Sequence, residues 1–105
     1  FGSLVRISSL PPQTIRMFLD VFTTLPQRVI LKFEEDVLDA PPNVIIRSWL
    51  PQTDIIAHPN VRLVVTHCGL ASTTESVYFA KPVVAVPFFS DQFQNAKNLV
   101  RRGVA

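Results

Sequence analysis

The fold is decided by the stretch VRLVVTHCGLAS, residues 61–72. Its first half is short, β-branched and almost continuously apolar, which predicts a buried strand from Val61 to Thr66. Its second half turns through Gly69 into a segment that we expect to be helical from Ala71 to Ala80. A buried strand that leads directly into a helix is typical of a parallel sheet covered by helices.

The same alternation extends in both directions from this stretch. Upstream, apolar residues follow helical spacing between Pro11-Pro12 and Pro26. Two short β-branched runs then predict strands at 28–33 and 44–49, separated by an acidic, proline-bearing loop. The other expected elements are a short helix capped by Thr53-Asp54 and running to Ala57, a strand at 83–86, and a helix from Asp91 to about Arg102 closed by Gly103. The predicted fold class is therefore α/β, a Rossmann-like parallel sheet with helices on both faces.

The chain has 105 residues, of which 48% are hydrophobic, so one domain with a modest buried core is expected. It starts without methionine and stops just after a helix-like segment. We therefore expect residues 1–105 to be a fragment of a longer protein.

Composition argues against several functional classes. The net charge is +2, and the basic residues are interleaved with acids, whereas nucleic-acid binding needs a concentrated basic face. The single cysteine, Cys68, excludes an internal disulfide, and two histidines with one cysteine make a dedicated zinc site unexpected. The longest uncharged run, 63–74, is too short to span a membrane and contains His67.

In open parallel sheets, ligands bind beyond the carboxyl ends of the strands. This rule selects Trp49, the turn His67–Ser72 and Ser90–Gln92. In the turn, backbone N–H groups, His67 and the helix dipole favour a phosphate or diphosphate, and Gly69 allows a close approach. Gly69 and Ser72 would equally serve a simple turn and a helix cap.

Two interpretations stay open for Glu75, for Trp49, for Gln52 and for the pair Asp91-Gln92. Glu75 lies three residues after Ser72, as in a capping box, but its carboxylate could also accept hydrogen bonds from ribose hydroxyls. Trp49 could stack on a base or belong to the core, and Gln52 could contact a nucleoside or lie in solvent. Asp91 and Gln92 suit sugar hydroxyls, although Asp91 also stands at the spacing of an N-cap with Gln94.

These motifs together resemble the UDP-glycosyltransferase family, enzymes of the GT-B fold that join a sugar to small lipophilic molecules. The resemblance rests on WLPQ-x-DIIAHP from Trp49, VTHCG from Val65, Glu75, PVVAVP from Pro82 and the pair Asp91-Gln92. Weaker likeness extends upstream, where Phe1-Gly2-Ser3 resembles the end of the loop that follows the first strand of the donor domain, and downstream to the helix that follows Asp91-Gln92. The resemblance implies that residues 1–105 are a partial nucleotide-sugar-binding domain, from the C-terminal half of a GT-B enzyme, without its first strand and its C-terminal elements.

The resemblance implies a role for each matching residue in holding a UDP-sugar. Trp49 would stack on the uracil, Gln52 would contact the nucleoside, and Glu75 would bind ribose hydroxyls. The other implied contacts are His67, Gly69 and Ser72 to the diphosphate, Asp91 and Gln92 to the donor sugar, and Gly2 and Ser3 to the sugar-phosphate region.

The resemblance also implies transfer of a hexosyl group with inversion, without a metal or other cofactor. The catalytic base of the family is a histidine in an N-terminal acceptor domain, so residues 1–105 contain no catalytic residue and alone should be inactive. The parent protein would lie in the endoplasmic reticulum membrane, facing the lumen, with no membrane contact from this segment. Ala71 stands where the family often has asparagine, which leaves a second interpretation: a non-catalytic nucleotide-binding or scaffold module.

Overall fold

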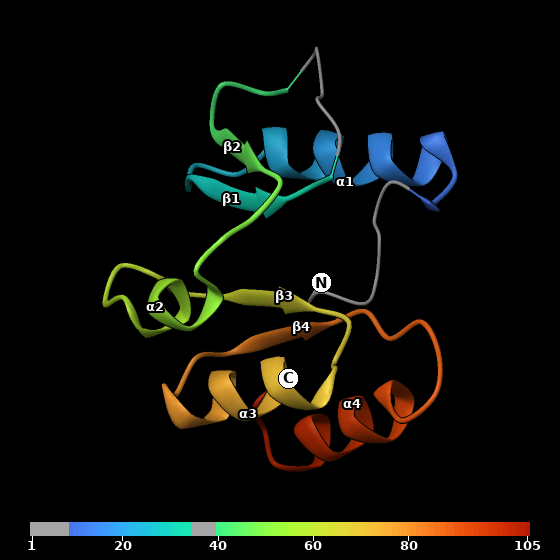
Figure 1. Cartoon of the computed structure of the whole chain (residues 1–105), viewed down its shortest axis with the longest axis vertical. Coiled ribbons are helices and arrows are strands. Elements are labelled where there is room, and N and C mark those ends of the chain that lie inside the picture. The colour runs from blue at the N-terminus through green and yellow to red at the C-terminus, as the bar shows by residue number, and fades with distance from the viewer. Residues whose placement is uncertain (1–8, 35–39) are drawn as a thin grey trace. The chain divides into compact units, whose positions relative to one another are not determined.

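The described chain contains four helices and four strands, which alternate except that the first two strands follow one another directly (Figure 1). The computed structural model describes residues 9–34 and 40–105. These residues divide into two compact units, one as far as Leu50 and the other from Pro51 to Ala105. Both strand pairings are parallel, which confirms the predicted α/β class. The four described strands form two sheets of two strands each.

The unit up to Leu50 is built around the helix α1 (Pro12–Thr23). Proline occupies its first position, where a missing N–H loses no helical hydrogen bond. Leu19 and Phe22 are buried on one side of this helix and pack with Val44 into a small core. The predicted helical stripe is therefore confirmed, although the helix ends at Thr23 rather than continuing to the proline at position 26.

Two parallel strands, β1 (Val29–Lys32) and β2 (Val44–Arg47), complete this unit. Their register places Val29 opposite Val44 and continues to Lys32 opposite Arg47. Each strand is two residues shorter than the six-residue run that predicted it.

The side chain of Asn43 joins α1 to the sheet. Its Nδ2 donates to the backbone carbonyls of Phe22, Leu25 and Gln27 at 2.9, 3.3 and 3.1 Å. The carbonyls after a helix end have no helical partner. One amide therefore satisfies the end of α1 and fixes it against the start of β2.

The second unit, from Pro51 to Ala105, contains the other five elements. The helix α3 contacts both β3 and α4, and the strands β3 and β4 run parallel to each other. In Figure 1 this unit is coloured from green through yellow to red. Its elements are α2 (Gln52–Ala57), β3 (Val64–Thr66), α3 (Leu70–Tyr78), β4 (Val83–Ala85) and α4 (Gln92–Arg101). The strand β3 begins at Val64 rather than at Val61 as predicted, because Val64 is the first residue that pairs with β4.

The core of the second unit lies between α4 and the sheet. Cys68, Val83, Ala96 and Leu99 are buried together, and Leu99 is one of the largest fully buried side chains among the described residues. Val64 and Ala85 of the two strands, both partly buried, pack against this cluster. The turn that carries Cys68 is thereby held in a packed interior.

Two predicted helix caps do not form. The helix α2 begins at Gln52, before Thr53-Asp54, and no side chain caps it. Asp91 precedes α4 as predicted, but its backbone is already helical (φ −66°, ψ −12°) and no side-chain cap with Gln94 forms. An N-cap side chain reaches the first turn from an extended backbone, which Asp91 lacks. The predicted glycine at the other end is confirmed, because Gly103 has φ +73° there.

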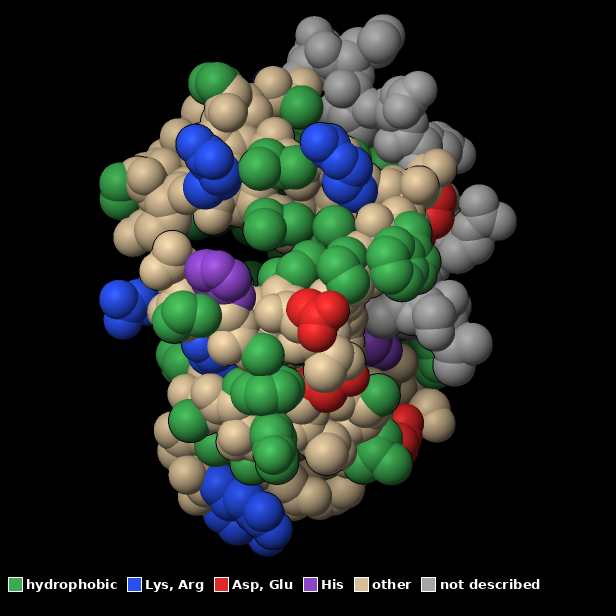
Figure 2. All heavy atoms as spheres, turned by 60° about the vertical axis from the view of Figure 1, so that its left-hand side comes forward, with side chains coloured by type: hydrophobic (Ala, Val, Ile, Leu, Met, Phe, Trp, Pro, Cys, Tyr) green, Lys and Arg blue, Asp and Glu red, His purple; other side chains and the backbone are tan. Residues whose placement is uncertain are grey.

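Lys and Arg side chains lie at separate places on the face drawn in Figure 2, so no continuous basic surface forms on that face. No helix in the described part of the chain combines the length and the apolar character needed to cross a bilayer.

Candidate functional site

The turn between β3 and α3 is buried and conformationally strained. Thr66, His67 and Cys68 are all at least nine-tenths buried. Cys68 has φ +70°, a left-handed backbone conformation that residues other than glycine rarely adopt. Two hydrogen bonds hold it there. The Cys68 N–H donates to Thr66 Oγ1 at 3.2 Å, and Asn95 Nδ2 donates to the Cys68 carbonyl at 2.9 Å. The turn therefore depends on α4 as well as on the strand before it.

Gly69 serves this turn through space rather than through backbone freedom. Its φ is −61° and its ψ is 151°, which any residue can adopt. A Cβ at this position, however, would stand 2.5 Å from Nε2 and 2.9 Å from Cε1 of His67. The imidazole of His67 thus lies directly against the Gly69 backbone. The close approach that the sequence predicted at Gly69 is made here by the histidine ring.

The helix α3 begins at Leu70 with Gly69 at its N-cap, and no side chain caps this end. The first backbone N–H groups of a helix have no intrahelical acceptor, and they carry the positive end of the helix dipole. With His67 beside Gly69, this end of α3 combines uncapped N–H groups and an imidazole. Such a combination favours an anion.

Burial governs the charge state of His67. Loss of solvent lowers the pKa of this imidazole from its ordinary value of 6.5, and the Asp91 carboxylate partly opposes that shift. The ring is therefore neutral at pH 7, with one nitrogen donating and the other accepting. Its Nδ1 is buried without a hydrogen-bond partner among the described residues. A neutral ring in this position acts on an anion through an N–H rather than through a full positive charge.

Glu75 lies on α3 one turn beyond this end, and both of its carboxylate oxygens accept hydrogen bonds from α2. Gln52 Nε2 donates to Oε2 and Thr53 Oγ1 donates to Oε1, each at 3.1 Å. Gln52 Nε2 also donates to Ser72 Oγ at 3.1 Å. The structure thus brings together three predicted site residues, Gln52, Ser72 and Glu75, and adds Thr53, which sequence reasoning had assigned only to a cap.

The alternative interpretation of Ser72 and Glu75 as a capping box is wrong. The helix begins at Leu70, so Ser72 lies inside the first turn instead of before it. Its side chain is buried and accepts from Gln52, and no side chain caps the helix. The capping-box spacing would fit a helix that starts three residues later.

Asp91 and Gln92 differ sharply in their surroundings. Asp91 is exposed at the start of α4, close enough to His67 to affect its pKa. Gln92 is buried, and its Oε1 accepts from the backbone N–H groups of Phe88 and Phe89 at 2.9 and 3.1 Å. The carbonyl of Gln92 therefore holds the loop before α4. Its amide nitrogen donates to none of the described residues.

Three predicted site residues lie elsewhere. Trp49 belongs to the unit up to Leu50, just beyond the end of β2, and its side chain is 73% exposed. Trp49 therefore belongs to neither of the two core clusters among the described residues, which contradicts its interpretation as a core residue. Gly2 and Ser3 lie outside the described residues.

Asn95 is a residue that sequence reasoning missed. It supports the His67 turn from 27 positions further along the chain. No local pattern marks it, because its role depends on how α4 packs against the turn.

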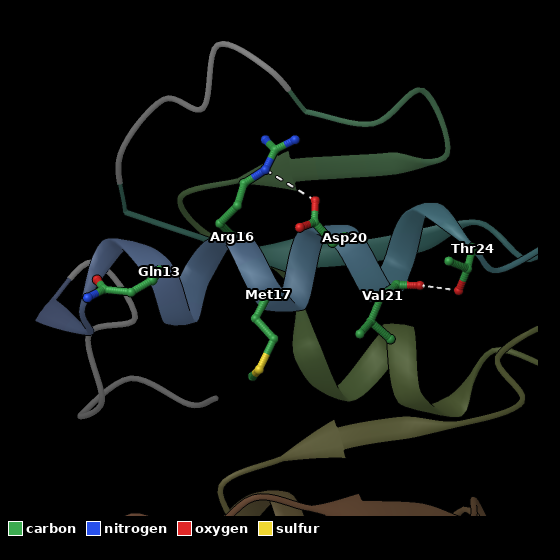
Figure 3. A pocket seen from close by; sticks show the side chains of 6 residues that line it. All are labelled: Gln13, Arg16, Met17, Asp20, Val21 and Thr24. Carbon is green, nitrogen blue, oxygen red and sulfur yellow. Dashed lines mark hydrogen bonds and ion pairs between the residues drawn. The ribbon is translucent and has the colours of Figure 1, made fainter.

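A hollow of about 530 Å³ runs along the exposed side of α1 (Figure 3). Arg16 and Asp20 form an ion pair at 3.2 Å beside it, with both side chains more than half exposed. None of the predicted site residues lines this hollow. Its lining residues are Gln13, Arg16, Met17, Asp20, Val21 and Thr24.

Comparison with known proteins identifies relatives of this chain. A family model described as UDP-glucoronosyl and UDP-glucosyl transferase matches residues 1–105. UDP-glucosyltransferase 2 of Dactylopius coccus is 45% identical over 104 residues, which is 99% of this chain and 20% of the relative. UDP-glucuronosyltransferase 3A1 of Xenopus laevis is 41% identical over 100 residues, covering 91% of this chain and 19% of that protein. The chain thus spans about a fifth of the length of these relatives.

A solved structure has a fold similar to that of this chain. The glycotransferase of kitacinnamycin superposes with a TM-score of 0.84 at 26% identity, over 100% of this chain and 28% of that protein. The Rossmann-like interpretation of the alternating elements is therefore confirmed. On the family match over its whole length and on these relatives, the chain belongs to the UDP-glycosyltransferase family.

Proposed function

We propose that this chain binds the nucleoside diphosphate part of a UDP-sugar, with the diphosphate at the start of α3. The observation that carries the proposal is the uncapped N-terminal end of α3 beside the imidazole of His67, which lies against Gly69. Uncapped N–H groups and a neutral imidazole N–H offer hydrogen bonds to a diphosphate. These hydrogen bonds do not require a cation that accompanies the ligand. No metal or other cofactor is needed for this mode of binding.

The other predicted site residues would make the remaining contacts. Glu75 would accept the ribose hydroxyls, and Gln52, whose amide N–H groups already donate inside the protein, would meet the nucleoside through its Oε1. Ser72 Oγ accepts from Gln52, so its hydroxyl proton is available for the diphosphate. The exposed Trp49 would stack on the uracil, and Asp91 and the Gln92 amide would hold the sugar.

In the whole protein, this chain would supply the donor half of a hexosyltransferase. The acceptor oxygen would attack the anomeric carbon with inversion, and UDP would leave. The end of α3 and His67 would stabilise the negative charge that develops on the leaving diphosphate. The acceptor is proposed to be a small lipophilic molecule bound by another domain, which would also provide the base. A location at the endoplasmic reticulum membrane stays a prediction from the family resemblance.

Calorimetric titration of the chain with UDP and with uridine tests the diphosphate site. His67→Ala should weaken UDP binding about 10- to 150-fold, the effect of losing one charge-assisted hydrogen bond of about 1.5–3 kcal/mol. Uridine, which has no phosphate, should bind both forms equally. His58→Ala is the matched control, because His58 is exposed and makes only a local contact with the Asn60 N–H. If His67→Ala lost affinity for UDP and for uridine equally, or lost no affinity for UDP, the proposed site would be rejected.

Binding without transfer is the second candidate function, and one residue favours it. Ala71 is exposed in the first turn of α3, where an amide side chain would add a hydrogen bond to the same anion. Assaying the whole protein with UDP-glucose and a phenolic acceptor separates the two functions. Formation of a β-glycoside from the α-linked donor, detected by NMR, supports inverting transfer. Tight UDP binding with no product supports the binding module.

A further inference from the structure

The carboxylate of Glu75 is held from two sides by donors on another helix. A terminal torsion of a glutamate side chain has a broad energy profile, so an unsupported carboxylate rotates freely. Here Thr53 Oγ1 engages Oε1 and Gln52 Nε2 engages Oε2, both at 3.1 Å. Two donors, one on each oxygen, fix the plane of the carboxylate.

The remaining capacity of this carboxylate matches a pair of adjacent hydroxyls. An ionised carboxylate can accept about four hydrogen bonds, roughly two on each oxygen. One site on each oxygen is occupied by α2, which leaves each oxygen able to accept one more. The 2′- and 3′-hydroxyls of a ribose are two neighbouring donors of the right number for this arrangement.

We propose that Thr53 is a positioning residue that orients Glu75 to accept the 2′- and 3′-hydroxyls of a ribonucleotide together. It thereby sets the preference of the site for ribose over deoxyribose. This inference rests on the proposed function and deepens it. Thr53 acts through Glu75 and touches no ligand itself.

An alternative role for Thr53 is the stability of its own helix. The structure argues against it, because no side chain caps α2 and the Thr53 hydroxyl donates to Glu75 across 22 positions of sequence. Thr53 is also exposed, so replacing its hydroxyl with a methyl group leaves no buried polar group unpaired on α2. A change in ligand preference is therefore separable from a change in folding.

The test compares calorimetric dissociation constants for UDP, 2′-deoxy-UDP and 3′-deoxy-UDP. The chain as it stands should favour UDP over each deoxy analogue by about tenfold, the effect of about one hydrogen bond. Thr53→Val, which keeps the shape of the side chain, should weaken the binding of UDP several-fold. It should also reduce the ratio of each deoxy analogue's dissociation constant to that of UDP to about two or less. Thr53→Ser, which keeps the donor, should restore the ratios.

Thr74→Val is the matched control. Thr74 is exposed on α3, and its hydroxyl donates only to the Leu70 carbonyl, so the same loss of a hydroxyl should leave the ratios unchanged. Circular dichroism checks that each variant is folded, and Thr53→Ala serves as a second variant if Thr53→Val is not.

The outcomes separate the two proposals. If the unsubstituted chain binds no UDP, the proposed function fails and this inference fails with it. If the chain binds UDP and discriminates against the deoxy analogues, but Thr53→Val discriminates equally well, only the role of Thr53 is overturned.

Discussion

The contact between Gly69 and His67 leads to a quantitative prediction for Gly69→Ala. The new Cβ would stand 2.5 Å from His67 Nε2, whereas non-bonded heavy atoms prefer about 3.5–4.0 Å, so the ring must withdraw by about 1 Å or more. A charge-assisted hydrogen bond of about 2.8 Å from this ring would lengthen beyond the range in which it counts as a hydrogen bond. The backbone contributes no cost, because its φ of −61° suits alanine.

The expected effect is therefore on diphosphate binding more than on folding. Losing a hydrogen bond to a charged group costs about 1.5–3 kcal/mol, which raises the dissociation constant for UDP about 10- to 150-fold. Displacing the ring inside a packed turn costs about 1–3 kcal/mol of folding free energy at most, so the protein should still fold. Isothermal titration with UDP and with uridine, together with urea denaturation, measures both quantities.

Gly103→Ala provides the opposite control. A Cβ there would meet no atom within 4 Å, but the residue has φ +73°, so alanine should cost about 1 kcal/mol of stability and leave UDP affinity unchanged. If Gly69→Ala bound UDP with unaltered affinity, or if it lost uridine as strongly as UDP, the imidazole would not be part of the diphosphate site.

Two further predictions concern the stability of the same turn. Because burial lowers the pKa of His67 in the folded chain, the unfolded chain binds more protons, and stability should be complete above pH 6.5 and fall as the pH drops below it. Urea denaturation between pH 5 and 8 should show this slope, and His67→Gln should flatten it; an unchanged slope would contradict the assignment. Asn95→Ala, which removes the donor to the strained Cys68 carbonyl, should cost about 1–3 kcal/mol in the same assay. Asn98→Ala, at an exposed side-chain contact on the same helix, should cost less than about 0.5 kcal/mol, and equal losses would show that the turn does not depend on Asn95.

The sequence was sufficient to predict the elements and their order, because hydrophobic periodicity is a local property. The helix with Leu19 and Phe22 on one face and the apolar strand ending at Thr66 follow from spacing alone. The rule that ligands bind beyond the carboxyl ends of parallel strands also selected His67, which lies in the turn after β3.

Helix starts were predicted less well, because several residues near each start can cap a helix. Ser72 has the side chain of a cap, yet α3 begins at Leu70. The choice is made by where the buried strand ends and by the room that Gly69 leaves for the His67 ring. Neither the end of the buried strand nor the space beside Gly69 can be predicted from a local motif.

Only the tertiary structure decides which residues far apart in the sequence form hydrogen bonds with each other. Thr53 and Gln52 reach Glu75 across more than twenty positions, and Asn95 reaches Cys68 across 27. These bonds exist because α2 and α4 pack near α3 and its preceding turn, and packing depends on the whole set of buried surfaces rather than on any one segment. The residue types at the candidate site could therefore be predicted from the sequence, whereas the hydrogen bonds that orient them required the fold.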